Sequence, residues 1–248
     1  MLKALALDFD GVICDGFNEC VLVTWYGPRA GTLADFGASG LSAIPPAFVR
    51  RFLHCRAFAK HLGHFYVSLL DGIDGVRTQA DFEALYASAN PLDVESFVVR
   101  VNEYRALVRN HLPDSWLSQQ GLYPGVRDFL RQTRLPLYVV TAKDAASVTQ
   151  ILEHAGVRLD AGRIFGELRD KRAALAQICS AEQITPAALG VVDDNVLNAL
   201  AAQRAGFRAY WALWGYRAPD HAAIADENHL PRLLLDQLLS GQDWQSAA

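Results

Sequence analysis

The sequence has few of the features that mark a membrane, secreted or nucleic-acid-binding protein. None of its apolar runs approaches the ~18 residues of a membrane-spanning helix, and the short N-terminal run ends in Asp8 rather than at a small-residue cleavage site. Basic residues do not exceed acidic ones, since the net charge is −4. Nothing therefore favours nucleic acid or an anionic membrane as a partner, and we expect a cytoplasmic protein, either a monomer or a homodimer.

Cysteine and lysine are both scarce. The four cysteines have no CxxC spacing, which favours neither a metal cluster nor a disulfide framework. The four lysines stand at positions 3, 60, 143 and 171, so the position of each is more informative than usual. Apolar residues make up 51% of the 248 residues, enough for a substantial core in one large domain or two smaller ones.

The chain has two regions with different sequence patterns. From about 117 onward, short apolar runs alternate with helical patterns, which predicts a parallel sheet. We expect strands at 2–7, 137–140, 164–165, 190–192 and 208–213. Between them we expect helices at 145–155, 172–179 and 196–205, a further helix with Pro124 in its first turn, and a last helix opened by Pro231. The stretch 16–116 carries only helical periodicity, for example in 45–62 and 97–111. We therefore predict an α/β core domain, 1–15 and 117–248, with an inserted all-helical cap domain, 16–116.

Acidic residues follow two of the predicted strands. Asp8 and Asp10 follow the first strand and emerge on one side because strand side chains alternate. The pair Asp193 and Asp194 follows the strand at 190–192. Such strand ends share one edge of a parallel sheet, where ligands bind. Four carboxylates there repel each other without a cation, and oxygen-only ligands suit Mg²⁺ rather than zinc. The simpler readings are an Asp-Gly turn and a helix N-cap.

Phosphate-binding groups are predicted at the same edge. Thr141 ends another strand and offers its hydroxyl, together with nearby backbone N–H groups such as that of Ala142, to a phosphate oxygen. Lys171 offers a compact positive charge. Lys143 competes for this role, although it lies close to Thr141 in sequence. The simpler readings are a β-branched strand end and a solvated helix start.

These residues in this order resemble the haloacid dehalogenase-like superfamily of phosphohydrolases. Asp8-Phe9-Asp10-Gly11-Val12 is similar to its first motif, Val139-Val140-Thr141 to its second, Lys171 to its third and Val191-Val192-Asp193-Asp194 to its fourth. The segments Leu122-Tyr123-Pro124-Gly125 and Trp214-Gly215-Tyr216 are similar to phosphoglycolate-phosphatase-like members. The resemblance implies a Rossmann-like core with a helical cap.

By resemblance, the activity is Mg²⁺-dependent hydrolysis of a small phosphorylated metabolite through an aspartyl-phosphate. Asp8 is implied as nucleophile and Asp10 as acid and base. The carboxylates of Asp8 and Asp193 and the backbone carbonyl of Asp10 are implied as metal ligands, and Asp194 is implied to ligate the metal or to order its waters. Thr141, Ala142 and Lys171 are implied to hold the phosphoryl group.

Two alternatives remain open. A sugar phosphomutase of the β-phosphoglucomutase type has a similar first motif, but that branch carries a cap histidine where this chain has Cys20. A non-catalytic interaction protein that retained the fold is the other. Cap arginines are candidates to bind a second anionic group, although charge runs on helices usually face solvent; they are Arg50, Arg51, Arg56, Arg100, Arg105 and Arg109.

Overall fold

The computed structural model describes residues 1–241 and divides the chain into two compact units. The first unit comprises 1–15, 122–217 and the chain from 221 onward; the second comprises 16–121 and 218–220. Where the chain passes between them, β2 (Cys14–Asp15) pairs with β3 (Gly121–Leu122) in a two-stranded sheet.

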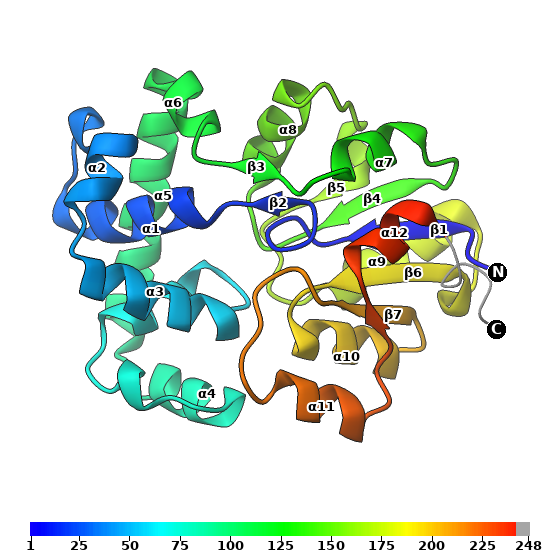
Figure 1. Cartoon of the computed structure of the whole chain (residues 1–248). Helices are drawn as coiled ribbons and strands as arrows, with labels where there is room; N and C mark the ends of the chain where they lie inside the picture. The colour runs from blue at the N-terminus through cyan, green and yellow to red at the C-terminus, as the bar shows by residue number, and fades with distance from the viewer. Residues whose placement is uncertain (242–248) are drawn as a thin grey trace. The chain divides into compact units, whose positions relative to one another are not determined.

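A six-stranded sheet forms the centre of the first unit (Figure 1). All of its strand pairs are parallel and their order is β5-β4-β1-β6-β7-β8. The strands are β1 (Ala4–Leu7), β4 (Leu137–Val140), β5 (Ile164–Phe165), β6 (Leu189–Asp193), β7 (Arg208–Ala212) and β8 (Arg232–Leu233). The parallel α/β fold predicted from the alternating pattern is confirmed.

Burial on both faces explains why the strands are continuous apolar runs rather than alternating ones. Every residue of β1 and β4 is buried. On one face, Ala4 and Ala6 belong to a core cluster that includes Leu175 of α9 (Arg172–Glu182) and Leu200 of α10 (Val196–Arg204). Since strand side chains alternate, the leucines of β1 point to the opposite face, and helices cover both faces (Figure 1).

The helices of the first unit differ from the sequence prediction at two prolines. Helix α7 (Val126–Gln132) begins after Gly125, whose φ of +80° suits glycine, so Pro124 precedes the helix rather than lying in it. Pro231 does not open a helix: β8 follows it, paired with β7, and α12 (Leu235–Ser240) comes later. Helix α8 (Ala145–His154) lies where it was predicted, and α11 (His221–Glu227) was not predicted.

Helical segments make up the second unit, and no strand occurs between 16 and 120, a stretch that the structure describes throughout. The α-helices are α1 (Phe17–Tyr26), α2 (Ala38–Ala43), α3 (Pro46–Phe58), α4 (Gln79–Ala87), α5 (Pro91–His111) and α6 (Pro113–Leu117). The 3-10 turns are η1 (Gly27–Arg29), η2 (Leu33–Asp35), η3 (Leu62–Leu69) and η4 (Ile73–Gly75). The glycine-rich stretch 27–40 contains two of these turns and the start of α2.

A buried ion pair lies inside the second unit. The Glu19 carboxylate on α1 is fully buried and accepts a 2.7 Å hydrogen bond from Nε of Arg105 on α5. The indole N–H of Trp116 donates to the same carboxylate at 3.4 Å. Arg105, one of the arginines considered for anion binding, is therefore committed to the interior of its own unit.

No helix in the described part of the chain is long and apolar enough to cross a membrane. All four cysteines are buried and free of disulfides. Burial raises the pKa of Cys55 to about 12, which keeps this thiol protonated at neutral pH.

The ion pair in the second unit predicts a large stability effect. Arg105→Met leaves the Glu19 carboxylate buried without its cation, so we expect the free energy of unfolding to fall by about 3–5 kcal/mol. The matched control is Arg172→Met, which breaks an exposed pair with Asp170 and should cost less than about 1 kcal/mol. Urea denaturation followed by circular dichroism measures both. Similar small losses in the two variants would contradict the prediction.

Candidate active site

Two adjacent strands bring three carboxylates together. Asp8 follows β1 directly, and its backbone N–H donates to the carbonyl of Val192 on β6 at 2.9 Å. Asp193 ends β6 and Asp194 follows it. Carboxylate oxygens of Asp8, Asp193 and Asp194 all lie within 4.8 Å of one another. The predicted convergence at the carboxyl edge of the sheet is therefore present for these three.

Asn195 rather than the aspartates caps the helix after β6. Its side-chain oxygen accepts hydrogen bonds from the backbone N–H groups of Leu197 and Asn198, at 3.1 and 3.3 Å. Asp193 instead accepts from the backbone N–H of Asn195 at 2.9 Å and lies close to Lys171. The N-cap interpretation of the two aspartates is thus wrong, and their carboxylates lie in the cluster with Asp8.

Lys171 links two of these carboxylates. It is the N-cap residue of α9, and its Nζ lies 3.0 Å from Asp8 and 2.7 Å from Asp193. Burial alone would lower the pKa of Lys171, but the charges of Asp193 and Asp8 raise it above its usual value. Burial raises the pKa of Asp193, and Lys171 opposes that shift. The geometry thus assigns Lys171, not Lys143, to Asp8.

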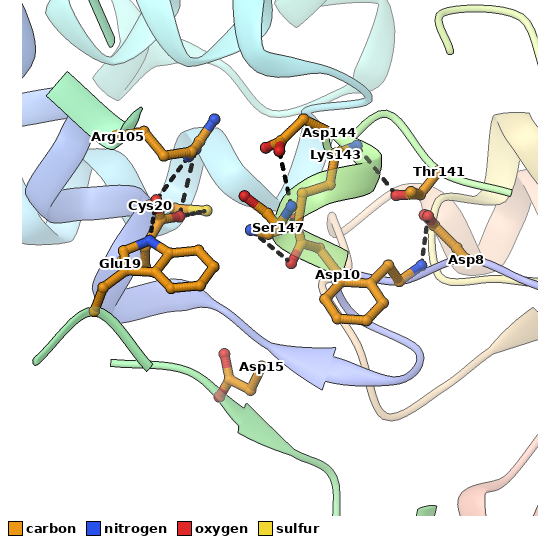
Figure 2. Close-up of polar contacts among 12 residues, drawn as sticks. Asp8, Asp10, Asp15, Glu19, Cys20, Arg105, Thr141, Lys143, Asp144 and Ser147 are labelled. Carbon is orange, nitrogen blue, oxygen red and sulfur yellow. Dashed lines mark hydrogen bonds and ion pairs between the residues drawn. The ribbon is translucent and has the colours of Figure 1, made fainter. Parts of the chain in front are cut away.

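Thr141 lies at the end of β4, the other neighbour of β1. Its backbone N–H donates to the carbonyl of Phe165 on β5 at 2.9 Å, which holds the strand end in place. Its hydroxyl oxygen accepts a bond from the backbone N–H of Lys143 at 3.2 Å (Figure 2). Ala142 follows in a bend at the same edge.

Asp10 occupies a separate position in the site. It does not belong to the group of three aspartates whose oxygens lie within 4.8 Å. Nζ of Lys143 lies 3.5 Å from each of its carboxylate oxygens, and the Lys143 side chain is only 2% exposed. Figure 2 shows this lysine reaching the Asp10 carboxylate.

A loop after β7 fixes Asp194. The backbone N–H of Tyr216 donates to the Asp194 carboxylate at 2.8 Å, and the indole of Trp211 donates to its backbone carbonyl at the same distance. Two glycines leave room for this arrangement, because a Cβ on Gly11 or Gly215 would lie 1.9 or 2.6 Å from an Asp194 carboxylate oxygen. Gly11 also has a φ of +91°, which disfavours any side chain.

The donor chemistry at this edge fits a hard divalent cation. The three clustered aspartates offer only carboxylate oxygens, which suits Mg²⁺ better than zinc. Two of the three are almost completely buried, so their mutual repulsion is weakly screened. Such a cluster favours bound positive charge.

Comparison with known proteins agrees with this geometry. The family model of haloacid dehalogenase-like hydrolases matches residues 2–206. The chain belongs to the haloacid dehalogenase-like hydrolase family. Within it, the chain is 27% identical over 224 residues to a phosphoglycolate phosphatase from Chromobacterium violaceum, covering 87% of this chain and 86% of the relative. On these findings the protein is a hydrolase.

Solved structures support the fold. A predicted phosphoglycolate phosphatase from Haemophilus somnus matches with a TM-score of 0.63 at 17% identity, covering 98% of each chain. A hydrolase from Pseudomonas syringae matches with a TM-score of 0.61 at 15% identity, covering 98% of this chain and 99% of the other. The haloacid dehalogenase-like fold class is thereby confirmed over nearly the whole chain.

Two features of the hydrolase site were not anticipated from the sequence. Lys143 was considered only as a substitute for Lys171, whereas its side chain reaches Asp10. The scarcity of lysine was the sequence signal that could have marked Lys143 as a separate site residue. The backbone N–H of Tyr216 gave none, because a main-chain donor has no sequence signature.

The close approach of glycine to Asp194 predicts a specific sensitivity. A methyl group in Gly215→Ala would lie 2.3 Å from the carbonyl oxygen of Gly11 and 2.4 Å from Cβ of Asp194. We expect a loss of about 1–3 kcal/mol of stability from overpacking and a clear loss of hydrolytic activity. Gly162→Ala is the matched control, because its Cβ meets nothing within 4 Å. Urea denaturation and hydrolysis of p-nitrophenyl phosphate measure the effects; equal behaviour of the two variants would contradict the prediction.

Proposed function

We propose that this hydrolase is a Mg²⁺-dependent phosphatase that acts on a small phosphorylated metabolite through an aspartyl-phosphate on Asp8. The observation that carries the proposal is the position of Lys171 at one sheet edge, where its Nζ lies 3.0 Å from Asp8 and 2.7 Å from Asp193. A carboxylate without nearby positive charge cannot readily approach an anionic phosphate, and here a largely buried ammonium lies against the proposed nucleophile.

Asp8 attacks phosphorus in the proposed first step, and the bond to the leaving oxygen breaks. Asp10 gives its proton to that oxygen, and in the second step it takes a proton from the water that attacks the aspartyl-phosphate. Inorganic phosphate leaves, and Asp8 is regenerated as a carboxylate.

In the proposed reaction, Lys171 and a bound metal ion would together neutralise the charge of the phosphoryl group. Asp8, Asp193, Asp194 and the backbone carbonyl of Asp10 are the proposed ligands of Mg²⁺, which when bound neutralises charge on the phosphoryl oxygens. Lys171 keeps Asp8 and Asp193 close together despite their like charges. The hydroxyl of Thr141 and the backbone of Ala142 are proposed to hold phosphoryl oxygens.

For the substrate class, we propose small phosphate monoesters, with phosphoglycolate as the first candidate. Its support is the curated relative of that name, which aligns over 87% of this chain. The cytoplasmic location and the monomeric or dimeric state stay predictions.

Replacing the nucleophile tests the mechanism directly. Asp8→Asn should lower the rate of phosphate release by about a thousandfold or more, because a carboxamide does not form the covalent intermediate. The matched control is Asp226→Asn, which changes an exposed carboxylate paired with Arg232 and should keep full activity. The assay is phosphate release from a panel of esters that includes phosphoglycolate. Retained activity in Asp8→Asn would exclude the mechanism, and isomerisation of a sugar phosphate without phosphate release would indicate a mutase.

Chelation tests the metal. We expect EDTA to abolish phosphate release and added Mg²⁺ to restore it, because the oxygen ligands of the site suit this ion. Asp193→Asn should raise the Mg²⁺ concentration needed for half-maximal activity by about tenfold or more, because mutations that remove a group supporting a metal site typically weaken metal binding by that factor. Full activity in EDTA would contradict a metal-dependent reaction.

Lys171→Met tests the charge balance. The variant leaves Asp8 and Asp193 without the ammonium that joins them, so we expect kcat/KM to fall by about 10²–10³-fold. The matched control is Lys60→Met, which removes a lysine paired with Glu83 in the second unit. Equal activity of the two variants would contradict the role of Lys171.

A further inference from the structure

Lys143 is a buried cation whose position the proposed chemistry does not yet use. Its side chain is 2% exposed, and its Nζ is equidistant, at 3.5 Å, from the two carboxylate oxygens of Asp10. Lys171, by contrast, reaches Asp8 and Asp193. The two lysines therefore contact different carboxylates of the site.

The backbone around Lys143 is held firmly. Its N–H donates to the hydroxyl of Thr141 at 3.2 Å, and its carbonyl accepts from the N–H of Glu167 at 3.0 Å. Gly166 allows the close approach, since a Cβ there would lie 2.8 Å from the Lys143 carbonyl oxygen. Asp144 then caps α8 by accepting from the N–H of Ser147 at 2.8 Å (Figure 2). Such an anchored backbone supports a side chain with one defined direction.

Asp10 has few other restraints on its carboxyl group. Its oxygen Oδ1 is buried and lacks a hydrogen bond in the described part of the chain, while Oδ2 accepts from Lys143 at the limit of hydrogen-bond length. A buried oxygen without a hydrogen bond is costly unless another molecule supplies the partner. When Oδ1 carries the proton of the acid, it becomes a donor, and the leaving oxygen of a substrate is then an acceptor that fits it.

We propose that Lys143 is a positioning residue for Asp10, holding its carboxyl group so that one oxygen meets the leaving oxygen of the substrate. This rests on the proposed phosphatase function. In the first step the bond between phosphorus and the leaving oxygen breaks, its electron pair stays on that oxygen, and the proton of Asp10 moves there. Lys143 forms no bond in this step and acts through the orientation of Asp10.

A competing role gives a different kinetic signature. If Lys143 bound the phosphoryl group itself, replacing it would lower kcat/KM by the same factor for every phosphate ester. If Lys143 acts through Asp10, the fall in kcat/KM depends on how much the leaving oxygen needs a proton. An alkoxide is a poor leaving group and needs one, whereas p-nitrophenolate leaves readily without it.

The first experiment compares leaving groups in Lys143→Met. We expect kcat/KM for an alkyl phosphate that the wild type hydrolyses to fall by about 100-fold, the lower end of general acid catalysis, and kcat/KM for p-nitrophenyl phosphate to stay within about threefold. The ratio kcat/KM is used because it excludes the later hydrolysis step, which is common to all esters. Asp10→Asn should show the same leaving-group pattern. An equal loss for both esters, or no loss for either, would overturn the proposal.

The second experiment is a double-mutant cycle with the alkyl ester. In the Asp10→Asn background, Lys143→Met should cause no further loss, because a positioning residue has nothing left to position. Additive losses would overturn the proposal. Lys143→Arg, which keeps the charge, should recover part of the alkyl-ester activity, and failure of this rescue in a variant with wild-type circular dichroism would also count against it. Retained activity in Asp8→Asn would instead refute the catalytic mechanism itself, so the two failures are distinguishable.

Discussion

Repulsion among carboxylates gathered at one sheet edge is the constraint on which the rest of this site depends. Asp8, Asp193 and Asp194 place oxygens within 4.8 Å of one another, and two of the three side chains are almost inaccessible to water. Such an arrangement persists only when positive charge lies close to it. The chain supplies two ammonium groups from its small number of lysines, that of Lys143 buried and that of Lys171 largely buried, and the oxygen-rich cluster offers a place for a divalent cation.

The two lysines divide the site into functional halves. Lys171 joins the proposed nucleophile Asp8 to the proposed ligand Asp193, so it lies in the half proposed to bind phosphate and metal. Lys143 meets Asp10, so it lies in the half proposed to supply the proton of the leaving group. Because the two halves use different cations, neutralising the phosphate need not disturb the orientation of the acid.

Parallel strands supply the precision that this charge arrangement needs. β1 lies between β4 and β6, so the residues that follow the three strands meet at one edge. Main-chain N–H groups that donate to a carboxylate of the site, as at Tyr216, fix the loops beyond the strands, and glycines let a side chain approach the backbone closely, as Asp194 does at Gly11. In the helical unit, by contrast, Glu19 and Arg105 neutralise each other in the interior, so this buried charge serves stability.

Local pattern determined much of the core. Apolar runs ending in Asp8, Thr141 and Asp193 predicted the strands and their shared edge, because a parallel sheet exposes polar groups only where its strands end. The two-residue strand β8 was missed, since it depends on pairing with β7 rather than on its own sequence. The sequence by itself also supplied the residue types of a metal and phosphate site. Motif order had already favoured Lys171 as the partner of Asp8. Only the tertiary structure showed that Lys143 meets Asp10, because the packed backbone sets where a long side chain starts, and spacing along the chain does not contain that information.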